Sequence, residues 1–335
     1  MFPLRKAIFE AARFEAMPAE QRHGLEREDA IGAPAIGDHF LPGWNFAEPL
    51  LEFLHRDVER AWHMAGGVLL RRPHVEDRHP IVAHISAKYP TDVNNSLALL
   101  RPRGGEIGPH ADGWGVAFHE GNAARVFKEP IPAAESRCLA FISEYDFKST
   151  TVIAHIRKAN PAEISRASAN THPFERELGG RSWVFAHNGK LPGLRDDPAA
   201  KPRRFQPIGE TDSEYAFCLL LDRIARRRTI DGLVEAIREP VRRLAAMGEF
   251  NFMLSDGAQL IVHPHTKLFI ARRACVESGC DQRVVLLATT PLTDEPWHAL
   301  AREQLYVYRA GEELAHNRYG SIGVRRARQA ELALH

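Results

Sequence analysis

Five short polar clusters follow apolar runs, at positions where strand ends and turns display side chains to a ligand. In one of them, FAHNGKL, the side-chain amide of Asn188 stands next to the unhindered backbone N–H of Gly189. Two such donors suit the negative charge that develops when an amide carbonyl is attacked. The other clusters are HADGWGVAF at 110–118, AHIRKA at 154–159, NTHPF at 170–174 and GETDSEYAF at 209–217.

In this order and approximate spacing, the five clusters resemble the class II glutamine amidotransferases, the N-terminal-nucleophile (Ntn) type. The likeness runs from about residue 81 to the C-terminus, includes ATTPLTDEPWHAL, and is strongest to stand-alone bacterial members. It implies an α+β fold, a four-layer αββα sandwich of two antiparallel sheets with helices outside. It also implies a pocket for glutamine or another γ-glutamyl amide.

The resemblance assigns roles to particular residues. Arg157 would clamp the α-carboxylate, a task that suits the fork of a guanidinium group, and Asp212 would accept from the α-ammonium. Asn188 and Gly189 would be the oxyanion donors. The remaining expected pocket residues are Asp112, Gly113, Trp114, Thr171, His172 and His187.

Each of these residues also has a simpler interpretation when taken alone. Arg157 after a strand is typical of a surface ion pair, and Asn188-Gly189 is typical of a hairpin turn. Asp212 begins Asp-Ser-Glu before an apolar run, the pattern of a helix N-cap. Asp212 could serve as both cap and ligand. The ordered set of motifs favours the shared fold and the ligand roles.

The nucleophile of that family is missing from its expected place. The resemblance implies an N-terminal cysteine whose free α-amino group relays the proton, and matching SAKYPTDV to the family's first strand puts that position at or beside Pro80. No Cys, Ser or Thr occurs between Leu70 and Ile85, and a segment precedes the position. Standard glutaminase chemistry is therefore predicted to be lost or rewired.

Other residues are poor substitutes for this nucleophile. His84 and Ser86 share the strand face of position 80, but a rise of about 3.3 Å per residue puts them roughly 13 Å and 20 Å along the strand. Reacting atoms must approach to about 3 to 3.5 Å. The cysteines are expected in other settings, Cys138 and Cys218 as buried core thiols and Cys275 and Cys280 in a solvent-facing loop. Their spacing, and that of His263 and His265, does not predict a metal site.

The elements that must position these residues fall into two regions. Residues 1–79 are predicted to form a helical N-terminal extension, and residues 80–335 the amidotransferase-like domain. In the second region, short alternating runs predict strands. Segments at 133–145, 213–228 and 229–247 predict helices between them.

Composition excludes several function classes. The 335 residues are 44% hydrophobic and 26% charged, and carry a formal net charge of +1. No overall field attracts nucleic acid, no apolar run approaches the roughly 20 residues of a membrane span, and four cysteines make no disulfide framework. A cytoplasmic protein without cofactor or metal is expected.

Three hypotheses about activity remain open. The first is a binding or regulatory protein that keeps the pocket without hydrolysis. The second is an active amidase or amidotransferase that uses an unrecognised nucleophile, or a terminus processed to expose Pro80. The third is an upstream gene-model error that hides a Met-Cys start. Because the domain fills everything after residue 80, any acceptor site would lie in a partner synthase or on a small molecule.

Overall fold

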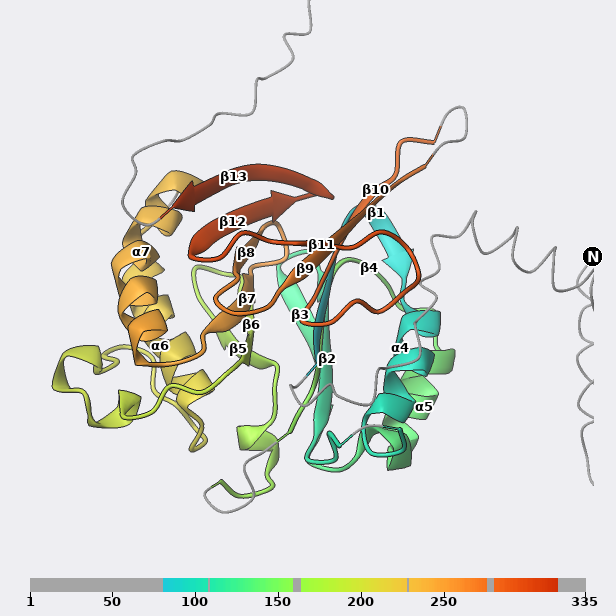
Figure 1. The fold of residues 1–335 in the computed structure, drawn as a ribbon, viewed down its shortest axis with the longest axis horizontal. Helices are drawn as coiled ribbons and strands as arrows, with labels where there is room; N and C mark the ends of the chain where they lie inside the picture. Colours follow the sequence, from blue (N-terminus) through green and yellow to red (C-terminus); the bar gives the residue numbers. More distant parts are fainter. Residues whose placement is uncertain (1–80, 108, 159–163, 228, 276–279, 319–335) are drawn as a thin grey trace, which may run out of the picture. The chain divides into compact units, whose positions relative to one another are not determined.

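The computed structural model describes residues 81–107, 109–158, 164–227, 229–275 and 280–318. They form two antiparallel sheets, of seven and six strands, with helices on their outer faces (Figure 1). The predicted helical extension over residues 1–79, and Pro80 itself, lie outside the described residues.

The first sheet has the strand order β11-β9-β10-β1-β4-β2-β3. Its strands are β1 (Ile81–Asp92), β2 (Trp114–Glu120), β3 (Ala123–Glu129), β4 (Lys148–Ile156), β9 (Phe269–Ala274), β10 (Arg283–Ala288) and β11 (His298–Ala299). The strand that would carry the nucleophile is therefore central, between β10 and β4. Helices α4 (Asn94–Leu100) and α5 (Arg137–Glu144) cover this sheet from outside.

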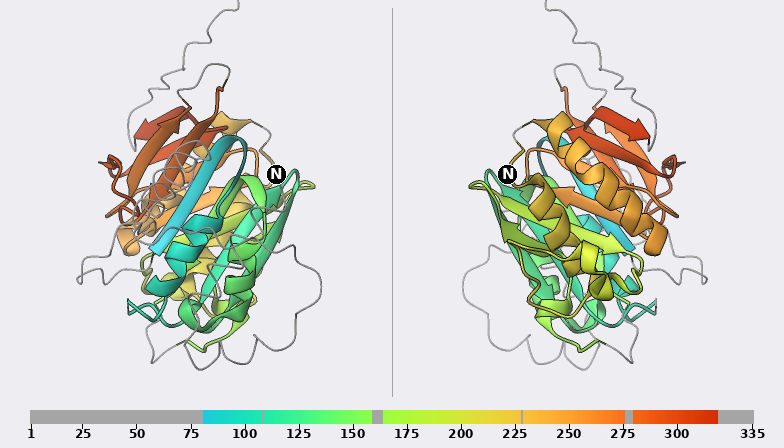
Figure 2. Two further views of the ribbon diagram at one scale, coloured as in Figure 1. Left: turned by 90° about the vertical axis from the view of Figure 1, so that its right-hand side faces the viewer. Right: turned by 90° about the vertical axis from the view of Figure 1, so that its left-hand side faces the viewer.

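The second sheet has the order β13-β12-β8-β7-β6-β5. Its strands are β5 (Phe174–Glu177), β6 (Ser182–Asn188), β7 (Asn251–Ser255), β8 (Leu260–His263), β12 (Gln304–Arg309) and β13 (Glu312–Arg318). Helices α6 (Asp212–Ile224) and α7 (Ile230–Met247) cover its outer face, on the opposite side of the molecule from α4 and α5 (Figure 2).

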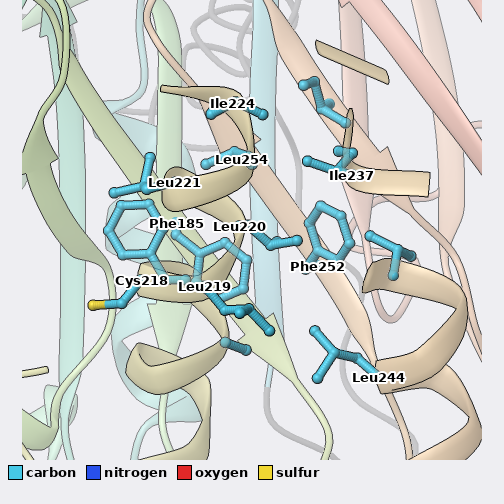
Figure 3. Packing of buried hydrophobic residues seen from close by; sticks show 14 of the residues in the cluster. Phe185, Cys218, Leu219, Leu220, Leu221, Ile224, Ile237, Leu244, Phe252 and Leu254 are labelled. Carbon is cyan, nitrogen blue, oxygen red and sulfur yellow. The ribbon is translucent and has the colours of Figure 1, made fainter. Parts of the chain in front are cut away.

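Three buried clusters separate the four layers. Alternate residues along a strand point to opposite faces, so a central strand such as β1 contributes to two clusters. On β1, Ile81 and Ile85 pack under α4 and α5, whereas Val82 lies between the sheets. The third cluster joins α6 and α7 to the second sheet through residues such as Phe185 and Leu220 (Figure 3). The predicted αββα sandwich is confirmed.

The cysteines occupy three settings. Cys218 is fully buried in the cluster beneath α6, as predicted, while Cys138 on α5 is only partly buried. Cys275 and Cys280, predicted to lie in a solvent-facing loop, form a disulfide with Cα atoms 5.7 Å apart. Because β9 and β10 pair as an antiparallel hairpin, the two ends of that loop lie side by side. The spacing of the two cysteines in the sequence does not by itself predict this pairing.

Candidate active site

The inner faces of the two sheets present polar side chains at one end of the sandwich. Val82 pairs with His155 on β4, and its backbone exchanges hydrogen bonds with Thr289 after β10. On the second sheet, Ala186 and Met253 face inward, so alternation turns Asn188 and Asn251 inward as well. Polar groups from four strands thus collect beside the start of β1.

Arg157 extends the inner row of β4 and is tied to the DGWG turn. Its backbone N–H donates to Gly113 O at 2.8 Å, its guanidinium donates to Asp112 O at 3.3 Å, and its side chain is buried. The Asp112 carboxylate forms an ion pair with Arg166 at 2.7 Å. Trp114 points to the outer face, into the cluster under α4 and α5, and so anchors the turn.

Thr171 and His172 lie beside the inner row of β4, next to His155 and Gly113. The Thr171 hydroxyl donates to Ala167 O at 2.9 Å, and the His172 ring stacks on His155 with centroids 4.2 Å apart. A Cβ on Gly115 would lie 2.2 Å from His172 O, so glycine is required for this close approach. His172 is buried, and within the described part of the chain neither of its ring nitrogens has a hydrogen-bond partner.

His187 fixes the end of β6 from its outer face. Its Nε2 donates to Glu249 O at 2.9 Å, because a carbonyl can only accept, and its Nδ1 lies 2.8 Å from Ser213 Oγ on α6. Gly189 follows with φ of +147°, and a Cβ there would lie 1.9 Å from Glu249 O. His187 therefore positions the two predicted oxyanion donors, Asn188 and Gly189, from behind.

Asp212 is not the helix cap. Thr211 caps α6 by accepting from Glu214 N at 3.1 Å, and Asp212 is the first helical residue. The Asp212 carboxylate accepts from Leu191 N at 2.6 Å and Ser213 N at 2.8 Å, which joins the helix to the segment after β6. A carboxylate has about four acceptor sites, so capacity for an ammonium remains.

Three buried imidazoles in this part of the structure have lowered pKa values. Burial holds the pKa of His172 well below its usual value, and the positive charges of Arg157 and Lys128 lower it further. Burial likewise lowers the pKa of His155 to about 3. The pKa of His187 is lowered by burial and raised in part by Asp212. The imidazoles are thus neutral near pH 7, and the cations beside them are Arg157 and Lys128, whose ammonium donates to Thr171 O at 3.0 Å.

A cavity of about 350 Å³ is lined by Asn188 but not by Arg157. Sequence reasoning missed the rest of its lining, since each residue alone resembles an ordinary surface or turn residue. One lining residue does stand out in the sequence: Asn251 is a polar residue between two phenylalanines, in GEFNF, at the start of a predicted strand. The other lining residues are Glu249, Asn251, Thr266, Lys267, Thr289 and Arg302.

The residues weighed as substitute nucleophiles, and the two histidines weighed as metal ligands, lie in other settings. His84 is buried in mid-strand, and the Ser86 hydroxyl accepts from Gly311 N at 3.3 Å. Both lie along β1 beyond Val82, as predicted. His263 and His265 are bonded to the backbone of Phe250.

Comparisons with known proteins agree with this arrangement. A family model described as glutamine amidotransferases class-II matches residues 82–276. The YafJ protein of Escherichia coli (strain K12) is 40% identical over 254 residues, which cover 69% of this chain and 97% of YafJ. A Haemophilus influenzae relative is 36% identical and covers 68% of this chain and 83% of its own length. Both names include glutamine amidotransferase.

Solved structures show the same fold. The crystal structure of a "predicted glutamine amidotransferase" from Pseudomonas aeruginosa PA01 has 35% identity and a TM-score of 0.56, and covers 70% of this chain and 99% of that one. Glutamine phosphoribosylpyrophosphate amidotransferase from B. subtilis, at 17% identity and a TM-score of 0.51, covers 73% of this chain and 50% of its own and shares the fold alone. With its two facing sheets and the matched region over most of the described residues, this chain belongs to the class II glutamine amidotransferase family.

Proposed function

We propose that this protein binds L-glutamine or another γ-glutamyl amide, and that the standard N-terminal cysteine mechanism is lost or rewired. The observation that carries the proposal is the buried Arg157 just after β4, a strand whose inner face packs against the sheet that carries the inward-facing Asn188. The charge of Asp112 already favours the Arg157 cation, but Asp112 is also ion-paired with Arg166, so the α-carboxylate of a substrate would give this buried cation a second anion.

The remaining residues match the other parts of this ligand. Asp212 has a carboxylate at the start of α6, near the segment that follows Gly189. Asn188 and the Gly189 N–H provide two donors for the γ-carbonyl oxygen. His172 is buried with no hydrogen-bond partner among the described residues, and a buried polar group of this kind calls for a partner that a ligand can supply.

Loss of the standard mechanism rests on the sequence before β1. The residues that lead to Ile81 read EDRHP and contain no thiol or hydroxyl. The polar groups that would hold the glutamyl carbonyl therefore have no nucleophile from the family's usual position.

Binding and turnover can be measured separately. We expect L-glutamine to bind the full-length protein saturably in calorimetry, with no ammonia release above the blank. Arg157→Lys keeps the charge but loses the bidentate fork, and should weaken binding roughly 10- to 100-fold. The matched control is Arg226→Lys, at an exposed position on the helical side, and should bind as the unaltered protein does.

Two results would contradict this proposal. Ammonia release that Arg157→Lys reduces would show an active amidase with an unrecognised nucleophile. An intact mass would then decide whether the chain had been processed to expose Pro80, because a protein that still begins near Met1 excludes that route. Absence of glutamine binding would refute the retained pocket.

A further inference from the structure

The cavity beside Asn188 has a position that follows from strand order. β1 lies between β4, which leads to Arg157, and β10, which leads to Thr289. Thr289 lines the cavity, whereas Arg157 and Asp212 do not. On the second sheet the cavity continues from the end of β6 to β7, through Asn251. Asn188 therefore stands between the proposed carboxylate clamp and the cavity.

This position defines which part of a ligand the cavity receives, if the proposed function holds. The α end of a γ-glutamyl amide would lie at Arg157 and its γ-carbonyl at Asn188 and Gly189. The amide nitrogen and its substituent then continue past Asn188, away from Arg157. That direction leads into the cavity.

The cavity is large enough for a leaving amine that is bigger than the –NH2 group of glutamine. A volume of about 350 Å³ compares with roughly 30 Å³ for a molecule of the size of water or ammonia. It lies at the lower end of the range for small-molecule sites, about 300 to 1,000 Å³. Glutamine would leave most of this space unfilled, whereas an amino-acid-sized amine would occupy it.

The lining charges indicate the chemistry of that amine. Lys267 and Arg302 are cations at the exposed side of the cavity, and Glu249 is the one carboxylate among its lining residues. The net charge of these side chains favours an anionic group at the far end. Thr266, Thr289 and Asn251 add neutral polar groups to the lining.

We propose that this cavity is the subsite for the amine portion of a γ-glutamyl amide, and that it selects amines that carry a carboxylate. The proposal rests on the proposed function, because it takes the γ-glutamyl part to be held at Arg157 and Asn188.

The test compares two ligands of nearly equal size. γ-Glutamylglycine and γ-glutamylethylamide differ chiefly in a terminal carboxylate against a methyl group. Calorimetry with the full-length protein should show γ-glutamylglycine binding about 3- to 5-fold more tightly, the effect of ion pairs with two cations that are exposed to solvent. L-glutamine is titrated in parallel.

The preference should depend on the two cations. Lys267→Gln combined with Arg302→Gln should bring the affinity ratio close to one and leave L-glutamine affinity unchanged. Lys201→Gln, at an exposed position outside the cavity, should keep the ratio. Equal affinities for the two amides in the unaltered protein, with L-glutamine bound, would overturn the subsite and leave the proposed function standing. No binding of any of the three would overturn both.

Discussion

At the residue scale, the site depends on glycine positions where an added Cβ would collide with a neighbouring backbone atom. Gly189 adopts φ of +147°, and its missing Cβ leaves room for the carbonyl oxygen of Glu249. His187 donates to that same oxygen. The turn after β6 is therefore pressed against the segment after α7, and this contact aims the Gly189 N–H.

Gly189→Ala should consequently destabilise the protein by roughly 3 kcal/mol or more, since backbone strain and overpacking each cost about 1 to 3 kcal/mol. Urea unfolding monitored by tryptophan fluorescence measures this loss. Gly193→Ala is the matched control, because Gly193 also has positive φ, +72°, but a methyl group added there would meet nothing within 4 Å. We expect about 1 kcal/mol there. Equal losses would show that the contact with Glu249 is unimportant.

Residue patterns predict the proposed glutamyl-binding residues better than the residues that line the cavity. Arg157, Asn188 and Asp212 each follow or precede a periodic run, so their placement at element ends is readable from the sequence. Lys267 and Arg302 stand in turns far from these motifs in sequence, and only the fold brings them to the same cavity. The pattern at Asp212 favours a cap because Asp and Thr are both good caps. The structure shows that the preceding Thr211 takes that role.

At the element scale, Asn251 at the start of β7 holds the turn after β8. Its Oδ1 accepts from three consecutive backbone N–H groups, of His265, Thr266 and Lys267, at 2.9 to 3.3 Å. Its Nδ2 donates to Asn188 O and to Thr266 Oγ1. One buried side chain thus joins the end of β6 to the wall of the cavity.

Asn251→Ala should cost about 3 kcal/mol or more, because several buried backbone groups lose their partner at once. Hydrogen exchange should accelerate at the amides of residues 265–267 by the corresponding factor. Asn251→Asp keeps the acceptor oxygen and loses both donated bonds, so we expect intermediate exchange. Unchanged exchange in the alanine variant would show that the turn is held by other contacts.

Strand and helix types are predictable because their periodicity is local. The helices expected over 213–228 and 229–247 are α6 and α7 within a few residues. Strand order is different, since β1 pairs with β4 and β10, neither of them its neighbour in sequence. The resemblance to a family implies that order, and the alternating pattern by itself does not.

At the scale of the whole molecule, the sandwich buries an unusual set of neutral histidines. Burial lowers the pKa of His155 and of His263 to about 3 and that of His119 to about 4. The pKa values of His84 and His172 shift in the same direction. These rings lie in different strands and loops, so the effect belongs to the fold as a whole.

Among the described residues no helix is long and apolar enough to cross a membrane.

These shifts predict acid-sensitive stability. An unfolded histidine binds a proton near pH 6.5, whereas the folded rings stay neutral until about pH 4 to 3. The unfolded state therefore binds more protons in this window, and stability present above pH 6.5 is lost as the pH falls toward 4. Each ring contributes on the order of 1 kcal/mol per pH unit, so the free energy of unfolding should drop by several kcal/mol between pH 7 and pH 5.

Urea unfolding at pH 7.5, 6.5 and 5.5 tests this expectation, and the slope against pH reports the proton uptake. His155→Gln removes one neutral buried ring, so its slope should be shallower by about one proton whatever its effect on stability at pH 7.5. His298→Gln, at an exposed position on β11, should leave the slope unchanged. A carboxylate that titrates in this range would change the slope of the unaltered protein and of both variants alike. A difference in slope between the two variants therefore identifies the buried imidazole of His155 as the group that takes up the proton. Equal slopes in the two variants would show that His155 takes up a proton as readily in the folded chain as in the unfolded one.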